Sequence, residues 1–381
     1  MPKTNSENII SEINSNVFFK EFSFSKNDFK DAMTNQELEF ADNIIWLDDI
    51  LFIYQIKEME KNSTNNESWY KNKVKNKAVK QIKNTLKYFD EFSEIIVENE
   101  KGHKLNIKEA RENSDIKKII IFHPNDDFPE DLRRLKFYKS TDIGLIHLFH
   151  SEDYYWICKY LITPVEILEY LYFREDFYYY NEKMINELPE QYLMGHFFET
   201  PNADHFNAKY ISNLTDQYER KSEFDVSLII ENFNKSIKLI SHQTEYYPII
   251  KEIAKLNRTE LTEFKKRISL SIEKCEKFEV IIPYRIYIQR TDCAFVFIPL
   301  HSSKSQHAMT ALHNFTMAHK YDMKATKCVG VVVYKDKTEH YEFFWQFADE
   351  VWSFDEELEK LLTDDFPFRK TSEKKVDNRY K

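Results

Sequence analysis

The segment from Glu39 to Lys57 constrains the fold of this chain more than any other stretch. It reads as two short apolar strands, Asn43–Leu47 and Ile50–Lys57, joined by a turn at Asp48-Asp49. Two such strands need further strands beside them and a layer of helices to bury their side chains. The segment therefore predicts a sheet-containing α/β domain at the N-terminal end of the chain.

The end of the second strand is polar, unlike the rest of it. Because side chains alternate between the two faces of a strand, Gln55 and Lys57 point to the same face. A lysine is an unexpected last residue for a strand that serves only as core. A buried lysine near carboxylates is instead typical of metal-dependent hydrolytic sites.

Composition sets wide limits on the function. The chain has 381 residues, of which 42% are hydrophobic and 31% charged, so it is long enough for two globular domains. It has only four glycines and lacks both common glycine-rich phosphate-binding motifs, which argues against nucleotide-dependent chemistry of the usual kinds. No apolar run approaches the roughly 20 residues that span a bilayer, so we expect a soluble, cytoplasmic protein without membrane contact.

The cysteines and histidines give no metal signal. Cys158, Cys275, Cys293 and Cys328 are widely spaced, which is typical of buried free thiols in a reducing compartment. Four histidines recur every six residues between His301 and His319. Six residues correspond to about 600° of helix, so successive histidines do not share a face, and we interpret the spacing as coincidence.

A basic helix is predicted directly after the two strands. Apolar residues recur at three- and four-residue steps from Val74 to Phe89 and form one helical stripe. Between Trp69 and Phe89 there are seven lysines and no acidic residue, although the whole chain carries a net charge of −10. A helix without acids forgoes the usual i,i+4 ion pairs, which favours an anionic partner. The simpler alternative is a solvated face in a lysine-rich protein.

The remaining pattern divides the chain into three parts. We expect a mixed α/β domain over residues 1–180, a polar linker over 181–222, and a second, α+β domain over 223–381. The first domain has further predicted strands at 95–98, 118–122 and 144–149, a helix beginning near Ser151 and another opened by Pro164. In the second domain we predict helices over 225–241, 246–277 and 305–320, strands over 280–289, 293–300, 328–334 and 340–347, and a frayed tail after Phe368.

The residues that carry chemistry lie at the polar end of the strand pair. Asp42 begins the first strand, and Gln55 and Lys57 end its partner, so all three can meet at one edge of the sheet. Glu39 can join them from the preceding segment. Carboxylate and amide oxygens suit Mg²⁺ or Mn²⁺, and a lysine ammonium can stabilise charge that develops on a phosphate. Gln55 offers only a neutral oxygen, so this set is poorer in charge than one with two strand carboxylates.

The pattern Glu39-x-x-Asp42 followed by Gln55-x-Lys57 resembles the active-site motif of the PD-(D/E)xK, restriction-endonuclease-like nuclease superfamily. The segment Lys77-Ala-Val-Lys80-Gln81-Ile is similar to the helix after the motif in NERD-like members. The resemblance covers about residues 20–180, including Ile143-Gly-Leu-Ile-His-Leu and Thr163-Pro-Val-Glu-Ile-Leu-Glu-Tyr-Leu-Tyr-Phe-Arg-Glu. The departure is Gln55, where the family usually has Glu or Asp.

The resemblance implies a restriction-endonuclease-like mixed sheet flanked by helices and a Mg²⁺- or Mn²⁺-dependent nuclease. Asp42 would ligate the metal, assisted by Glu39, Gln55 would fill the second acidic position, and Lys57 would orient water or stabilise charge. Lys73, Lys77, Lys80 and Gln81 would contact nucleic acid, with DNA favoured over RNA. A role in bacterial defence against phage or foreign DNA, a defence partner protein and a homo-oligomer are compatible with the resemblance.

Other interpretations stay open at this point. Asp42 can simply end a strand and Lys57 can extend to a sheet edge. The fold can bind nucleic acid or a partner without cutting, which the neutral Gln55 favours. The chain can also be an interaction scaffold whose second domain carries the function.

Overall fold

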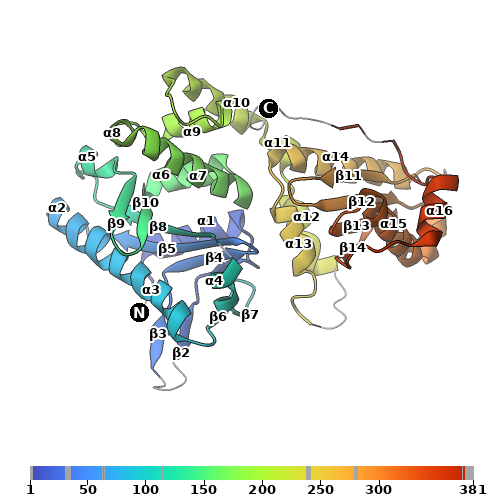
Figure 1. The fold of residues 1–381 in the computed structure, drawn as a ribbon, viewed down its shortest axis with the longest axis horizontal. Coiled ribbons are helices and arrows are strands. Elements are labelled where there is room, and N and C mark those ends of the chain that lie inside the picture. Colours follow the sequence, from blue (N-terminus) through green and yellow to red (C-terminus); the bar gives the residue numbers. More distant parts are fainter. Residues whose placement is uncertain are drawn as a thin grey trace. The chain divides into compact units, whose positions relative to one another are not determined.

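The computed structural model describes residues 3–30, 36–61, 63, 65–113, 115–236, 242–278, 282–370 and 372–373. The chain forms two compact units, Met1–Tyr218 and Glu219–Lys381 (Figure 1). Each unit has its own sheet and its own flanking helices. Within the described ranges, no helix has the length and apolar character needed to cross a bilayer.

The first unit is built on a six-stranded mixed sheet in the order β1-β4-β5-β8-β10-β9. β4 pairs antiparallel with both β1 and β5, while β5, β8 and β10 run parallel and β9 is antiparallel to β10. Two small hairpins, β2-β3 and β6-β7, lie outside it. The strands are β1 (Ser23–Phe24), β2 (Asp28–Lys30), β3 (Glu37–Glu39), β4 (Asn43–Leu47), β5 (Ile50–Glu58), β6 (Ile96–Glu98), β7 (Lys104–Asn106), β8 (Asp115–His123), β9 (Phe137–Ser140) and β10 (Gly144–His150).

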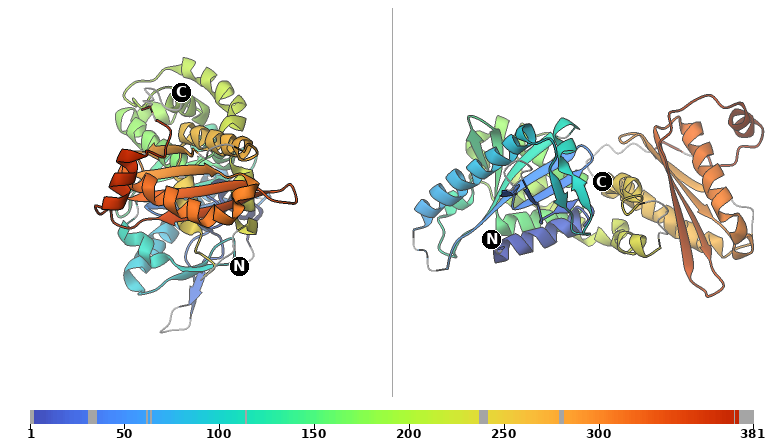
Figure 2. Two further views of the ribbon diagram at one scale, coloured as in Figure 1. Left: turned by 90° about the vertical axis from the view of Figure 1, so that its right-hand side faces the viewer. Right: turned by 90° about the horizontal axis from the view of Figure 1, so that it is seen from below.

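Helices cover both faces of this sheet (Figures 1 and 2). On one face, Ile44, Ile53, Ile120 and Phe122 pack with the apolar side of the basic helical segment in a single core. On the other face, α1 (Asn5–Val17), α6 (Ser151–Tyr160) and α7 (Pro164–Tyr180) lie over the strands, and Phe52 and Tyr54 meet aromatic rings there. A buried strand with helices on both sides needs no polar face, which explains why the middle of β5 is apolar throughout. The prediction of a mixed α/β unit flanked by helices is confirmed.

The predicted strand pair is present with the predicted turn. Leu47 pairs with Ile50, and Asp48 adopts the left-handed backbone conformation with φ of 55°. Asp tolerates this conformation better than most residues because its short side chain can bond locally. The turn residues therefore fix the register of β4 against β5.

The predicted basic helix runs from Asn66 to Glu91 in three pieces, α2 (Asn66–Trp69), a π-helix over Tyr70–Ala78 (η1) and α3 (Val79–Glu91). Its first buried residues, Tyr70, Val74 and Ala78, follow each other at four-residue steps. In an α-helix each such step overshoots a full turn by about 40°. In the wider π-helical turns the same step turns through a smaller angle, and all three side chains lie in the core that packs on the sheet.

The linker predicted for residues 181–222 is corrected by the structure. Most of it is helical, with α8 (Glu182–Ile185), α9 (Glu190–Glu199), the 3-10 helix η3 (Ala208–Ser212), α10 (Asn213–Glu219) and α11 (Lys221–Phe224), and the first unit extends through Tyr218. Leu193 and Phe197 of α9 are fully buried, and Phe197 packs on Tyr170 of α7. At Gly195 a β-carbon would lie 2.6 Å from the carbonyl oxygen of Tyr210, so only glycine permits this approach. Within this polar segment, Pro189 begins α9 and Asn207 begins η3.

The second unit is a four-stranded sheet in the order β11-β12-β13-β14. β12 and β13 are parallel and joined through α15, whereas β11 and β14 are antiparallel edge strands. α15 packs on one face and α14 places Phe264 against Phe295 and Phe297 on the other. The elements are α12 (Ser227–Ser236), α13 (Tyr247–Ala254), α14 (Arg258–Cys275), β11 (Tyr284–Ile288), β12 (Cys293–Pro299), η4 (Ser302–His307), α15 (Ala308–Met323), β13 (Lys327–Lys335), β14 (Tyr341–Ala348) and α16 (Glu356–Asp364).

The predicted elements of the second unit are present with shifted ends, except that the helix predicted over 246–277 is divided into α13 and α14. At Gly330 a β-carbon would lie 1.9 Å from the hydroxyl oxygen of Thr316, so this glycine lets α15 approach the sheet. The parallel β12-α15-β13 connection was not expected from the α+β prediction, which separates helices from strands. Several predicted positions lie outside the described residues: 237–241 of the predicted helix 225–241, 280–281 of the predicted strand 280–289, and 371 and 374–381 of the tail.

Candidate functional site

Asp42, Gln55 and Lys57 are brought together by the β4-β5 hairpin, and we call these three residues the hairpin site. Asn43 pairs with Tyr54, so Asp42 lies level with Gln55 at the open end of the hairpin. The alternation of the strand turns Gln55 and Lys57 to the sheet face that carries η1 and α3. The convergence that the sequence predicts for these three residues is present.

The hairpin site is a tight hydrogen-bonded group. Asp42 Oδ2 accepts hydrogen bonds from the backbone N–H of Ile56 at 2.5 Å and from Lys57 Nζ at 2.8 Å. Lys57 Nζ also donates to Gln55 Oε1 at 2.9 Å and to the carbonyl oxygen of Ile56 at 3.0 Å. A lysine ammonium has three protons, so these three oxygens satisfy all of them.

The hairpin site is nearly removed from water, but it reaches the surface. The exposed fractions are 6% for Asp42, 1% for Gln55 and 9% for Lys57. Ion pairs with so little solvent are strong only when each charge keeps its partner, and here one ammonium compensates one carboxylate. Lys57 therefore does not merely extend along the sheet edge into solvent, as one interpretation of the sequence allowed.

Glu39 lies beside the hairpin site rather than within it. It ends β3 and is exposed, and the hydrogen bonds that join Asp42, Gln55 and Lys57 do not include it. Partial burial raises the pKa of Glu39, and the nearby carboxylates of Asp42 and Asp28 raise it further. Glu39 thus stands within electrostatic reach of Asp42 but is not its hydrogen-bonded partner.

Asp28 is a site neighbour that the sequence analysis missed. It pairs with Glu39 across the β2-β3 hairpin and faces the same group of charges. Lys3, just before α1, also lies near Asp28 and Asp42, and burial lowers the pKa of its amine. The only available signal was the alternation Asp28-Phe-Lys30, which is too short to place a strand.

The basic helix exposes the lysines that the sequence analysis selected. Lys73, Lys77 and Lys80 are exposed, and in the described part of the chain no ion pair involves them. Their helix packs against β5, so they lie on the outer side of the layer that covers the hairpin-site face. Gln81 differs from them because it is half-buried and its Oε1 has no hydrogen-bond partner among the residues that the structure describes. Thr85, one turn further on, donates to the carbonyl oxygen of Phe40 and so ties the helix to the segment before Asp42.

The donor chemistry of the hairpin site suits a hard cation. The Asp42 carboxylate, the Gln55 amide oxygen and the Ile56 carbonyl oxygen converge on the point held by the Lys57 ammonium. Oxygen donors of these three kinds are the ones that Mg²⁺ and Mn²⁺ prefer. Across the ranges that the structure describes, however, no three His, Cys, Asp or Glu side chains are grouped as metal ligands.

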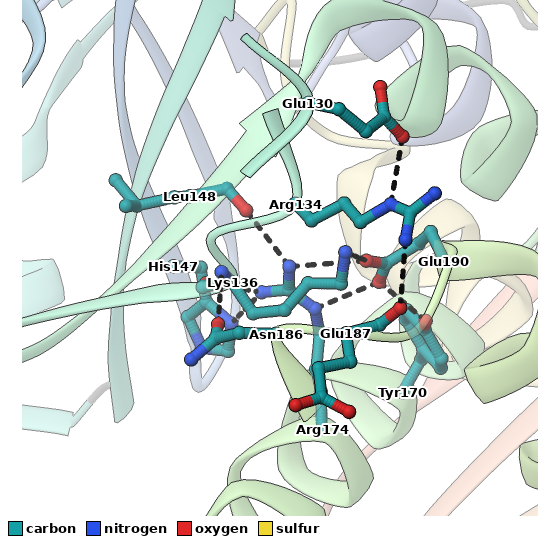
Figure 3. Close-up of polar contacts among 10 residues, drawn as sticks. All are labelled: Glu130, Arg134, Lys136, His147, Leu148, Tyr170, Arg174, Asn186, Glu187 and Glu190. Carbon is teal, nitrogen blue, oxygen red and sulfur yellow. Dashed lines mark hydrogen bonds and ion pairs between the residues drawn. The ribbon is translucent and has the colours of Figure 1, made fainter. Parts of the chain in front are cut away.

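A second polar cluster, which we call the Arg174 network, is drawn in Figure 3. Its His147 is level with Ile119 and Tyr54, so it lies on the sheet face opposite to Gln55 and Lys57. Arg174 of α7 donates from Nε to Glu190 Oε1 at 2.8 Å and from its other nitrogens to the carbonyl oxygens of Lys136 and Leu148. Lys136 Nζ lies 3.4 Å from Glu190 Oε2. These side chains are 0–2% exposed, so the network holds α7 and α9 against the sheet without access for a ligand.

Comparison of the chain with protein-family models, with curated proteins and with solved structures found no match. The assignment of function therefore depends on the geometry of the chain itself.

Proposed function

We propose that the first unit is a metal-dependent nuclease that hydrolyses phosphodiester bonds, with DNA as the favoured substrate. The observation that carries the proposal is the convergence of Asp42, Gln55 and Lys57 at the open end of the hairpin. An exposed lysine stripe on the helix that covers the same sheet face supports a polyanionic substrate. The restriction-endonuclease-like resemblance and a role in bacterial defence remain part of this proposal.

Asp42 and Gln55 would hold the metal, with Glu39 contributing from the neighbouring hairpin. When bound, Mg²⁺ or Mn²⁺ supplies charge stabilisation at the phosphate and a more acidic water. Lys57 supplies a positive charge that can contact a phosphate oxygen as negative charge develops on it. Asp42 and the Ile56 carbonyl orient the Lys57 ammonium, and the near-complete burial of the group strengthens these interactions.

The first test is cleavage of plasmid DNA, single-stranded DNA and RNA with and without Mn²⁺. The wild-type chain should cut DNA only with metal, and Asp42→Asn and Lys57→Ala should each abolish cutting. Asp48→Asn is the matched control, because it makes the same chemical change in the turn of the same hairpin, where Asn also tolerates the left-handed backbone. Cutting by Asp42→Asn and Lys57→Ala at the wild-type rate would exclude this site.

Gln55 allows a sharper experiment. Gln55→Glu restores the second acidic position while keeping the side-chain length, and Lys57 Nζ is already 2.9 Å from that oxygen. We expect tighter Mn²⁺ binding and faster cleavage in this variant, measured by calorimetry and on the same gels. Unchanged Mn²⁺ binding in Gln55→Glu would show that the residue does not face a metal.

The second candidate function is nucleic-acid binding without cleavage. The neutral Gln55, which offers a metal less charge than a carboxylate, favours it. In that case the wild-type chain would bind DNA with strong salt dependence yet leave all three substrates intact with Mn²⁺. If the chain binds DNA without cutting it, Asp42→Asn should still bind DNA.

A further inference from the structure

A cavity of about 520 Å³ opens on the first unit, away from the hairpin site. It lies between α3, α4 (Ala110–Asn113), the beginning of β8 and the turn that joins β9 to β10. In the sheet, Ile116 of β8 is level with Leu51 of β5, and Phe122 is level with Lys57. Six residues of strand span about 20 Å. A small ligand in this cavity therefore does not touch the hairpin site.

The lining of the cavity is positively charged. Four cations, Lys83, Lys87, Arg111 and Lys118, come from three different elements, and the only two carboxylates among the lining residues are Asp90 and Asp142. The formal charge of the lining is therefore +2. In a chain with a net charge of −10, this concentration of positive charge attracts anions to one place.

Three of the four cations form exposed ion pairs with described residues. Lys83 pairs with Asp142, Lys87 Nζ lies 2.7 Å from Glu91 Oε1, and Arg111 Nε lies 3.9 Å from Asp90 Oδ1. The side chains in these pairs are 43–69% exposed. Exposed pairs of this kind contribute little to stability, so a multiply charged anion can replace the carboxylates at small cost.

Lys118 differs from the other three because it is half-buried. Its Nζ donates to the carbonyl oxygen of Ile143 at 2.8 Å, and burial lowers the pKa of its amine. An ammonium that has lost part of its water gains more from a nearby anion than an exposed one does. Lys118 therefore supplies the inner positive charge of the cavity.

The rest of the lining is apolar. Leu86, Ile116 and Ile143 contribute side chains that also pack against the core. A volume of about 520 Å³ falls within the range of small-molecule sites. An apolar surface surrounded by cations suits a ligand with a flat apolar ring at one end and a phosphate at the other.

We propose that this cavity binds a nucleotide, with the phosphate among the four cations and the base against the apolar residues. The ligand chemistry is the same whether the nucleotide is free or forms the phosphorylated end of a strand. The proposal does not depend on nuclease activity, because its residues are separate from the hairpin site.

The test is calorimetric titration of the full-length chain with AMP, ATP and adenosine. We expect AMP and ATP to bind and adenosine to bind at least about tenfold more weakly, because it lacks the phosphate. Lys87→Gln with Arg111→Gln should weaken AMP binding about tenfold, and Lys118→Met should weaken it by a similar factor. The matched control is Lys73→Gln with Lys77→Gln, which removes two exposed charges from the same helical segment but outside the cavity and should change AMP affinity by less than about twofold.

Competition against bound AMP distinguishes the two sources of the nucleotide. Displacement by a 5′-phosphorylated single-stranded DNA, but not by the same strand without its phosphate, identifies a strand end. Displacement by free nucleotides alone identifies a small-molecule ligand. The proposal fails if neither AMP nor ATP binds, if adenosine binds as tightly as AMP, or if the control variant loses as much affinity as the cavity variants.

Discussion

The hairpin site and the Arg174 network lie on opposite faces of one sheet and use charge in different ways. In the Arg174 network, the guanidinium bonds Glu190 with two nitrogens and also contacts two backbone carbonyl oxygens and His147. Its central carbon also lies 4.8 Å from the ring centroid of Phe137 and 4.0 Å from that of Phe149. In the hairpin site, a single lysine is shared among three oxygens at the rim of the sheet.

This difference separates a structural charge cluster from a candidate functional one. A network whose side chains are only 0–2% exposed fixes the packing of helices and offers nothing to a ligand. Lys57 is 9% exposed, and the oxygen atoms around it also suit a metal ion. It can therefore give up these oxygens to a metal and turn to a ligand. Burial of charge alone thus does not identify a functional site; access to solvent and spare acceptor oxygens do.

The largest loss of stability is expected when the Arg174 network is broken. Burial by itself would raise the pKa of Glu190, but Arg174 and Lys136 beside it hold that pKa below its usual value. Glu190→Gln leaves these two cations buried without their carboxylate. Removing one partner of a buried pair typically costs about 3–5 kcal/mol. Urea unfolding should report a loss of that size. Asp142→Asn, which removes one partner of an exposed pair, is the control and should cost below about 1 kcal/mol.

A pH dependence should follow from His147 in the same network. Its Nδ1 accepts from Arg174 and its Nε2–H donates to Glu175, and burial, with Arg174 nearby, lowers the pKa of His147 to about 4. Because the unfolded pKa is about 6.5, the unfolded chain takes up the proton first, and stability falls as the pH is lowered from about 6.5 towards 4.

The predicted contribution of His147 to this loss is about 2 kcal/mol between pH 7 and pH 5. Urea unfolding at pH 7 and pH 5 measures how much the free energy of unfolding falls between the two. In His147→Gln this fall should be smaller by the contribution of His147. An equal slope in wild type and variant would show that folding does not lower the pKa of His147.

The coupling free energy between Asp42 and Lys57 in the hairpin site should be smaller than these losses of stability. In a double-mutant cycle, Asp42→Asn and Lys57→Met should each destabilise the chain, and the double variant should recover about 1 kcal/mol because neither charge is left alone. Additive losses would mean that the Asp42–Lys57 contact does not exist in solution.

The smallest effect on stability is expected for the lysine stripe. Lys73→Gln, Lys77→Gln and Lys80→Gln together should change the unfolding free energy by less than about 0.5 kcal/mol, since all three side chains are exposed. The same variant should lower DNA affinity and reduce the slope of log affinity against log salt by roughly 3. Gln substitutions at Lys337, Lys360 and Lys370, exposed lysines of the second unit, are the control and should leave the slope unchanged.

The local pattern of the sequence was sufficient for the hairpin and for three of its polar residues. Apolar strands, an Asp-Asp turn and strict alternation place Asp42, Gln55 and Lys57 together, because strand pairing across a short turn allows few registers. The basic helix was predictable for the same reason, since its periodicity lies within one continuous segment.

Contacts between distant segments could be decided only by the tertiary structure. Asp28 meets Glu39 through a hairpin too short to recognise, and Arg174 of α7 meets Glu190 of α9 and Lys136 of the loop before β9. The helices after residue 181 were hidden because their few apolar residues bury against α7 rather than along a long amphipathic stripe. Sequence determines the order and periodicity of charges along the chain, whereas the packing of the layers determines which of those charges meet and which of them still reach water.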